Sequence, residues 1–285
     1  MRRLDRCADV LAAHFAAGRN LCVGLDPDPA RLPATLAPSA PIDERVVAFH
    51  REIIDRTAEI ACAFKPNVAF YEALGEAGAR ALAATIRVAK DRAPDVPVIL
   101  DAKRADIGST NQGYVAAAFD VLGADAITVH PYLGREALRP FLEQDDKLIF
   151  VLARTSNPGG GEFQDLVVSG EPLYRRVARA VATDWNDRGN CGVVVGATFP
   201  DELAQVRQDI PPSVPALVPG VGAQGGDLAA AVEAHRRSGS EAFLISVSRS
   251  ILYASSGPDF ADAAGAEAQR VHAALRGERD APARG

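Results

Sequence analysis

Short apolar runs recur along the whole chain, and longer amphipathic segments fill the spaces between them. Eight of these runs have the length and composition of β-strands: 21–25, 61–64, 96–100, 126–129, 148–152, 192–195, 216–218 and 242–247. Within each run the residues are almost all apolar and do not alternate with polar ones. That pattern is typical of parallel strands that are buried on both faces of a sheet.

Alanine-rich amphipathic segments in the gaps predict helices, for example over 44–60, 78–91, 114–122, 174–188, 227–237 and 261–275. A strand and helix pair repeated eight times predicts an α/β protein with a closed (β/α)8 TIM barrel. We expect one domain over residues 1–276 and a disordered tail over 277–285. The alternative is an open doubly wound sheet, which would place a glycine-rich turn after the first strand. This chain has Asp26-Pro27-Asp28-Pro29 there, which argues against that fold.

Composition narrows the class of protein further. The chain has 285 residues, 48% of them hydrophobic, which suffices for one large core. A formal net charge of −6 argues against binding to nucleic acid or to an anionic membrane surface. The N-terminal segment is charged, and no run approaches the roughly 20 apolar residues of a membrane span. The four cysteines lie far apart, so we expect reduced, mostly buried thiols in a cytoplasmic protein.

In a barrel of this kind the chemistry lies at the carboxyl ends of the strands. These ends carry Asp26, Lys65 with Asn67, Asp101 with Lys103, His130, Arg154 to Ser156, Thr198, the loop 220–226, and Ser248 with Arg249. For the lone His130 we favour a structural role. The scattered histidines show no metal-ligand spacing, and we expect no metal site.

The segment after the third predicted strand is the most informative one. It runs Asp101-Ala102-Lys103-Arg104-Ala105-Asp106-Ile107-Gly108. Alternate residues of a strand share a face, so Asp101 and Lys103 should project together, with Asp106 one turn later. An ammonium group between carboxylates keeps its proton and can deliver it, so this pattern predicts proton transfer.

A phosphate site is predicted at the last two strand ends. Pro219-Gly220-Val221-Gly222-Ala223-Gln224-Gly225-Gly226-Asp227 opens a helix, where glycines permit close approach and the helix start favours anions. Arg249 supplies a cation beside it. Asp227 would in either case serve as a helix N-cap.

Two loops allow more than one interpretation. Ser109 with Gln112 has the form of a capping box, which gives Ser109 a structural role and leaves Thr110 open. The glycine-rich loop 156–161 after the fifth strand could be a mobile lid or an ordinary surface loop.

Taken together, these motifs resemble the orotidine 5′-phosphate decarboxylase family, in particular its longer bacterial branch. The resemblance covers about residues 26–253. It rests on Phe64-Lys65-Pro66-Asn67, the 101–108 segment, Thr155-Ser156-Asn157-Pro158-Gly159, the 219–226 loop and Val247-Ser248-Arg249. It implies decarboxylation of orotidine 5′-phosphate to UMP without a cofactor, in a homodimer with shared active sites.

The resemblance also assigns roles to residues. It implies an alternating charge array of Lys65, Asp101, Lys103 and the partner subunit's Asp106, with Lys103 as proton donor. Other positions would bind substrate: Asp26 and Lys65 at the ribose hydroxyls, with Thr110 joining from the partner subunit, Ser156 at the pyrimidine edge, and Gln224 and Arg249 at the phosphate. Asn67 is expected to bind substrate as well. Ser248 departs from the glycine or other small residue that many relatives carry, so a backbone phosphate contact there is in question.

Two other functions are compatible with parts of this pattern. A metal-dependent barrel that acts on sugar phosphates shares D-x-K-x-x-D, but it would need a carboxylate where Lys65 stands. A catalytically silent phosphate-binding barrel would tolerate losses in the charged set, yet all four members are present.

Overall fold

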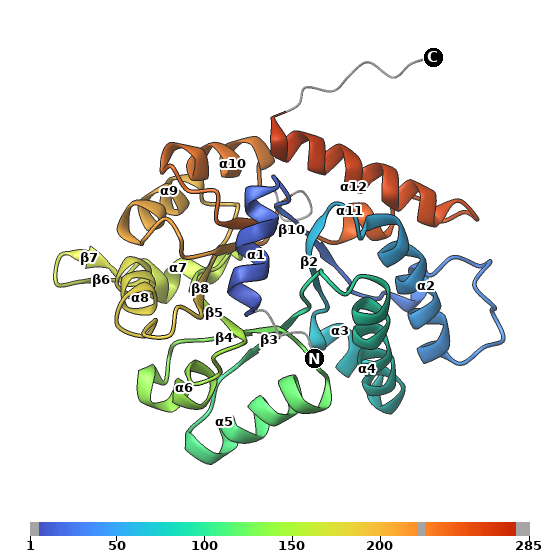
Figure 1. The fold of residues 1–285 in the computed structure, drawn as a ribbon, viewed down its shortest axis with the longest axis horizontal. Coiled ribbons are helices and arrows are strands. Elements are labelled where there is room, and N and C mark those ends of the chain that lie inside the picture. Colours follow the sequence, from blue (N-terminus) through green and yellow to red (C-terminus); the bar gives the residue numbers. More distant parts are fainter. Residues whose placement is uncertain (1–5, 222–225, 278–285) are drawn as a thin grey trace.

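The computed structural model describes residues 6–221 and 226–277, and eight parallel strands there form one rolled sheet (Figure 1). The strands are β1 (Leu21–Gly24), β2 (Ala61–Lys65), β3 (Ile99–Arg104), β4 (Ala126–Val129), β5 (Leu148–Arg154), β8 (Cys191–Val195), β9 (Ala216–Val218) and β10 (Phe243–Val247). Their order is β2-β1-β10-β9-β8-β5-β4-β3. The barrel closes where β3 meets β2, through parallel bridges between Phe64 and Val98 and between Asn67 and Asp101. The predicted (β/α)8 barrel is confirmed.

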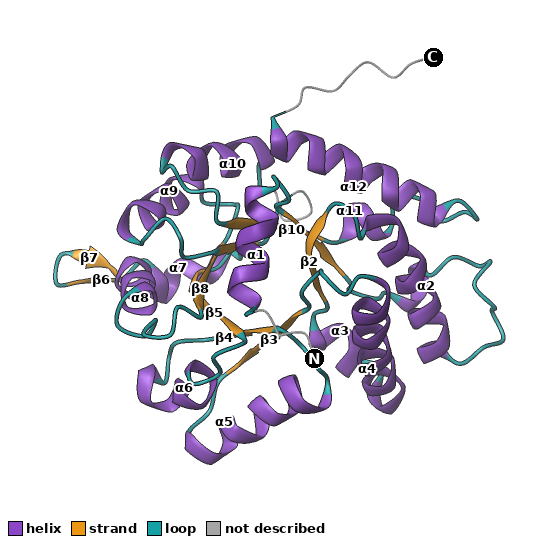
Figure 2. Cartoon of the chain, viewed as in Figure 1, coloured by secondary structure: helices purple, strands orange, loops and turns teal. Residues whose placement is uncertain are grey.

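Helices surround the barrel, as the purple ribbons of Figure 2 show. The longer ones are α2 (Ile42–Thr57), α4 (Gly75–Arg92), α5 (Gly108–Val115), α6 (Gly134–Leu142), α8 (Leu173–Ala182), α9 (Pro200–Asp209), α10 (Leu228–Arg237) and α12 (Phe260–Arg276). Shorter ones are α3 (Val68–Glu72), α7 (Gly161–Gln164), α11 (Arg249–Leu252), the 3-10 helices η1 (Pro29–Arg31) and η3 (Pro158–Gly160), and the π-helix η2 (Ala116–Val121). The helix expected over 174–188 ends earlier, at Ala182, where turns follow.

The core has two layers, which explains why the strands are apolar on both faces. Cys22, Ile99 and Phe150 belong to a cluster that fills the barrel. Val23 and Val151 belong to a second cluster between the strands and the outer helices. Neighbouring strand residues therefore face different apolar layers, and a continuous hydrophobic run follows.

Helix α1 (Cys7–Ala16) closes the amino-terminal end of the barrel. Its Leu11 and Phe15 join the inner cluster. The Cys7 amide donates to the Asp146 carbonyl, just before β5, at 3.0 Å. In Figure 1 this helix lies across the barrel opening. The opposite end, where the strands finish, is left for a functional site. All four cysteines are buried and unpaired, as predicted.

Two features at the edges of the barrel complete the fold. An antiparallel hairpin of β6 (Val167–Val168) and β7 (Glu171–Pro172), absent from the predicted elements, follows α7. Gly277 ends α12 with a left-handed φ of 75°, and the rest of the expected tail lies outside the described residues. No helix in the described part of the chain is long and apolar enough to cross a membrane.

Candidate active site

Three charged side chains from β2 and β3 form a row at the carboxyl end of the barrel. Lys65 Nζ lies 3.2 Å from Asp101 Oδ2, and Lys103 Nζ lies 2.6 Å from Asp101 Oδ1. The Lys65 and Asp101 side chains are buried, with 6% and 11% exposed, whereas 48% of the Lys103 side chain is exposed. The prediction that Asp101 and Lys103 project together is confirmed, and the Lys103 ammonium faces the accessible end of the row.

The charges of this row stabilise one another. Burial alone would raise the pKa of Asp101, but the positive charges of Lys65 and Lys103 hold it well below its usual range. Burial alone would lower the pKa of Lys65, but the negative charges of Asp101 and Asp26 raise it above its usual value. Both groups are therefore ionised at neutral pH, and Lys65 is a fixed cation.

Thr128 on β4 holds this row in place, and sequence reasoning missed it. Its hydroxyl donates to Asp101 Oδ1 at 2.9 Å and accepts from the Lys103 backbone N–H at 3.0 Å. Lys103 has a φ of 47°, a left-handed conformation that costs a residue other than glycine about 1–3 kcal/mol. Because threonine is common in strands, nothing in the sequence distinguished Thr128 from an ordinary strand residue.

Asp26, just after β1, lies on the same side of the barrel and is fixed by two neighbours. Its Oδ1 accepts the Asn67 backbone N–H at 3.1 Å, and the Tyr253 hydroxyl donates to its carbonyl at 3.1 Å. The Asn67 side chain caps α3 by accepting from the Ala69 N–H at 3.1 Å. Asn67 thus has a structural role in addition to the predicted substrate contact. Tyr253 was not predicted.

Asp106 does not join the row within its own chain. Its Oδ1 accepts the next backbone N–H, that of Ile107, at 2.7 Å, and it forms no ion pair with the described residues. Thr110 lies exposed on α5. One chain therefore brings together three of the four predicted charges, with Asp106 and Thr110 on the outward-facing segment that follows β3.

The expected capping box at Ser109 is wrong. Helix α5 begins at Gly108, with Ile107 as N-cap and no side-chain cap. The fully buried Asn111 performs the local bonding instead. Its Oδ1 accepts the Asp106 N–H at 2.9 Å, and its Nδ2 donates to the carbonyls of Asp106 and Ala137. A buried amide that satisfies three backbone groups fixes the segment that carries Asp106.

The predicted phosphate site is described in part. Asp227 caps α10, accepting from the Ala229 N–H at 2.8 Å, as predicted. The Gly226 backbone N–H donates to the Gly220 carbonyl at 3.0 Å. Arg249 is exposed at the start of α11, next to Ser248. Gln224 lies outside the described residues.

Ser156 is separated from β5 by Thr155 alone, and its loop is folded back on the barrel. The Thr198 hydroxyl donates to the Ser156 carbonyl at 3.1 Å. A Cβ atom on Gly196 would lie 2.6 Å from the Ser156 Cα, so only glycine at 196 permits this approach. The glycines after Ser156 form η3 and α7 in place of an extended loop.

The row of charges can supply a proton and stabilise a nearby negative charge. Lys103 presents an ammonium group at the accessible end of the row, 2.6 Å from Asp101 Oδ1. Within residues 6–221 and 226–277, no three His, Cys, Asp or Glu side chains gather as a metal-binding group. Lys65 occupies the strand end where a metal-binding carboxylate would otherwise stand.

Comparison with known proteins gives one consistent family. The model of the "Orotidine 5'-phosphate decarboxylase / HUMPS family" matches residues 19–264. A curated relative from Herpetosiphon aurantiacus, named orotidine 5'-phosphate decarboxylase, is 53% identical over 259 residues, which is 90% of this chain and 93% of the relative.

Solved structures agree with this match. An OMP decarboxylase from Leishmania donovani superposes with a TM-score of 0.78 at 38% identity, covering 94% of this chain and 98% of that one. A UMP synthase from the same organism superposes with a TM-score of 0.80 at 41% identity, covering 94% of this chain and 56% of that chain.

Proposed function

The chain belongs to the orotidine 5′-phosphate decarboxylase / HUMPS family, and we propose that it converts orotidine 5′-phosphate to UMP and CO2 without a cofactor. The single observation that carries this proposal is the row of Lys65, Asp101 and Lys103 at the carboxyl end of the barrel. It combines a fixed buried cation, an ionised carboxylate and an accessible ammonium group. Such a row suits a reaction that creates a carbanion and then protonates it.

The chemistry follows from the charges. The bond between C6 of the orotate ring and its carboxylate breaks, CO2 leaves, and the electron pair stays on C6. No adjacent carbonyl delocalises that pair, so a nearby positive charge must stabilise it. The Lys103 ammonium supplies the charge as the bond breaks and then gives its proton to C6.

Asp101 favours the departure of CO2 in this scheme. Its ionised carboxylate would lie beside the substrate carboxylate, and the two repel until that group leaves as neutral CO2. Enzymes lower barriers by about 8–23 kcal/mol, and a carbanion without delocalisation requires the upper end of that range. Binding energy from the phosphate and ribose would supply part of it by holding the substrate against these charges.

The remaining predicted residues would hold the substrate around this centre. We assign the ribose hydroxyls to Asp26 and Lys65, with Asn67 beside them, and the pyrimidine edge to Ser156. We assign the contacts with the phosphate to Arg249 and Gln224. The exposure of Arg249 supports a role in phosphate binding, because a protein with a net negative charge needs local cations to bind an anionic substrate.

We further propose a homodimer in which the partner subunit's Asp106 and Thr110 complete each site. Two observations support it. Asp106 forms no ion pair with described residues of its own chain, and it lies on a segment fixed by Asn111. Large apolar side chains are exposed after β2, β3 and β4, among them Phe70, Ile107 and Tyr132, with 42%, 65% and 92% exposed. An exposed apolar surface of this kind is typical of an interface.

Metal-dependent sugar-phosphate chemistry, which the same motif could support, fits this site less well. Lys65 is a buried cation 3.2 Å from Asp101, so it would repel a divalent ion at that carboxylate.

The proposal is tested by the loss of orotidine 5′-phosphate absorbance in the presence of purified protein and excess EDTA. We expect full activity with EDTA and no gain when Mg²⁺ replaces it. Activity that requires Mg²⁺ would favour the metal-dependent alternative. UMP binding without any turnover would favour a silent phosphate-binding barrel.

A further inference from the structure

Arg154, at the end of β5, is a buried cation that the proposed mechanism does not use. Only 2% of its side chain is exposed, and it lies outside the row of Lys65, Asp101 and Lys103. A β-bulge precedes it, because Leu152 pairs with Val194 and Arg154 with the next residue, Val195. Such a bulge places two residues of one strand opposite one of its neighbour and redirects a side chain.

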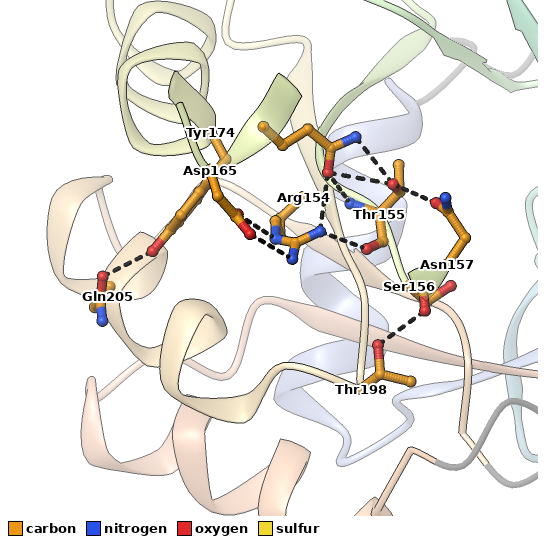
Figure 3. A network of polar contacts seen from close by, with 9 residues as sticks. Arg154, Thr155, Ser156, Asn157, Asp165, Tyr174, Thr198 and Gln205 are labelled. Atoms are coloured by element: carbon orange, nitrogen blue, oxygen red, sulfur yellow. Dashed lines mark hydrogen bonds and ion pairs between the residues drawn. The ribbon is translucent and has the colours of Figure 1, made fainter. Parts of the chain in front are cut away.

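The polar side-chain contacts of Arg154 are with the segment that follows β5 (Figure 3). Its Nη2 donates to Asp165 Oδ2 at 3.2 Å, and its Nε lies 3.1 Å from Asp165 Oδ1. Its Nη1 donates to Gln164 Oε1 and to the Thr155 carbonyl, both at 3.2 Å. The guanidinium carbon lies 3.9 Å from the centre of the Phe199 ring. A planar cation is thus held between the loop after β5 and Phe199, the residue that precedes α9.

Gln164 extends this network to the residue next to Ser156. Its Oε1 accepts the Thr155 backbone N–H at 2.9 Å, and its Nε2 donates to the Thr155 hydroxyl at 2.9 Å. That hydroxyl donates in turn to Asn157 Oδ1 at 2.6 Å. Thr155 and Asn157, on either side of Ser156, are therefore both tied to the network of Arg154 and Gln164.

The glycines of this loop are explained by the same packing. A Cβ atom on Gly160 would lie 2.7 Å from Arg154 Nη1, and one on Gly161 would lie 2.4 Å from Asp165 Oδ2. A side chain at either position would therefore displace the Arg154 guanidinium or the Asp165 carboxylate.

We propose that Arg154, through Asp165 and Gln164, is a positioning residue that fixes Ser156 for contact with the pyrimidine ring of the nucleotide. The assignment rests on the proposed function, because it takes Ser156 as the residue that meets the base. Because only 2% of the Arg154 side chain is exposed, Arg154 acts in this proposal through the loop and not by contact with the substrate. Its effect should therefore be confined to ligands that carry a base.

The test compares the binding of UMP with that of ribose 5-phosphate, which has no base, by calorimetry. Arg154→Lys should weaken UMP binding about five- to tenfold, as expected for one hydrogen bond that is lost or misplaced. Ribose 5-phosphate binding should change by less than about twofold. Equal weakening of both ligands would show general damage to the barrel mouth and would overturn the assignment.

Arg207 provides a matched control. It is also an arginine with 2% exposure. It donates to the Val214 carbonyl at 2.8 Å and to Ser240 at 2.7 Å, next to the amino-terminal ends of β9 and β10. Arg207→Lys removes a buried guanidinium at the far end of the barrel, so it should leave the affinity for both ligands unchanged.

Two further variants keep the test decisive. In the double variant Arg154→Lys/Ser156→Ala, UMP should bind as it does to Ser156→Ala alone, because both changes remove the same contact. If the fold-losses in UMP affinity of the two single variants instead multiplied in the double variant, Arg154 would act independently of Ser156. If Arg154→Lys does not fold, Asp165→Asn, at a half-exposed carboxylate, should give the same ligand pattern, and unchanged UMP affinity would contradict the proposal. Wild-type protein that binds neither ligand would refute the proposed function, and the role of Arg154 with it.

Discussion

Replacing Lys103 with alanine is expected to lower kcat by about 10⁴-fold or more while the barrel remains folded. The variant removes both the proton donor and the cation that faces the carbanion. These two contributions are usually worth about 10²–10⁴-fold and 10²–10³-fold respectively, so their joint loss should leave little activity. Steady-state decarboxylation of orotidine 5′-phosphate measures the effect.

The fold should tolerate this substitution for reasons visible in the site. Nearly half of the Lys103 side chain is exposed, and an ion pair with such exposure adds little to stability. Asp101 would keep Lys65 at 3.2 Å and the Thr128 hydroxyl at 2.9 Å. The thermal transition should therefore stay close to that of the wild type.

Lys90→Ala is the matched control. Lys90 also pairs with an aspartate, Asp125, but at the amino-terminal end of β4 and away from the site. It should lose a comparable ion pair with no loss of turnover. If Lys103→Ala retained a rate within about tenfold of the wild type, another group would have to supply the proton.

Mixing two inactive variants, Lys103→Ala and Asp106→Ala, is expected to restore about a quarter of the wild-type activity. If each site combines Lys103 of one chain with Asp106 of the other, a hybrid dimer has one site with both defects and one with neither. Random exchange of equal amounts makes about half of the dimers hybrid, and half of their sites intact. Activity is measured after subunit exchange under mild denaturant and return to buffer.

A mixture of Lys103→Ala with Lys65→Met serves as the control. Lys65 and Lys103 both contact Asp101 of the same chain, so every site in such a hybrid carries one defect. No activity should return. If the Lys103→Ala and Asp106→Ala mixture also stayed inactive, despite demonstrated exchange, Asp106 would not act in the partner subunit's site.

The fold was predictable because its pattern is local and repeated. Strands buried between two apolar layers carry continuous hydrophobic runs, and all eight were located within a few residues. Helix boundaries were less certain. Helix α5 begins at Gly108 because Asn111 satisfies the backbone groups before it, a role that the S-x-x-Q pattern at Ser109 concealed. The hairpin β6–β7 has only two residues in each strand, too few for periodicity to reveal.

The charged part of the site was predictable for a different reason. Strand ends of a barrel meet at one face, so Lys65, Asp101 and Lys103 could be brought together from their positions alone. The residues that hold these three side chains in place could not be predicted in this way. Thr128 and Tyr253 act through contacts with residues 27 and 227 positions away in the sequence, which no local pattern encodes. Arg154 was visible at a strand end, but its role depends on how the following loop folds back over it.

The hydrogen isotope found at C6 of the product tests the central claim most directly. Wild-type protein, treated with EDTA, is incubated with orotidine 5′-phosphate in ²H2O, and the products are followed by NMR and by CO2 release. If the site releases CO2 and an exchangeable ammonium protonates the carbanion, each CO2 should be matched by one UMP that carries deuterium at C6. A different product, protium in place of deuterium at C6 of UMP, or a requirement for added metal would contradict the account.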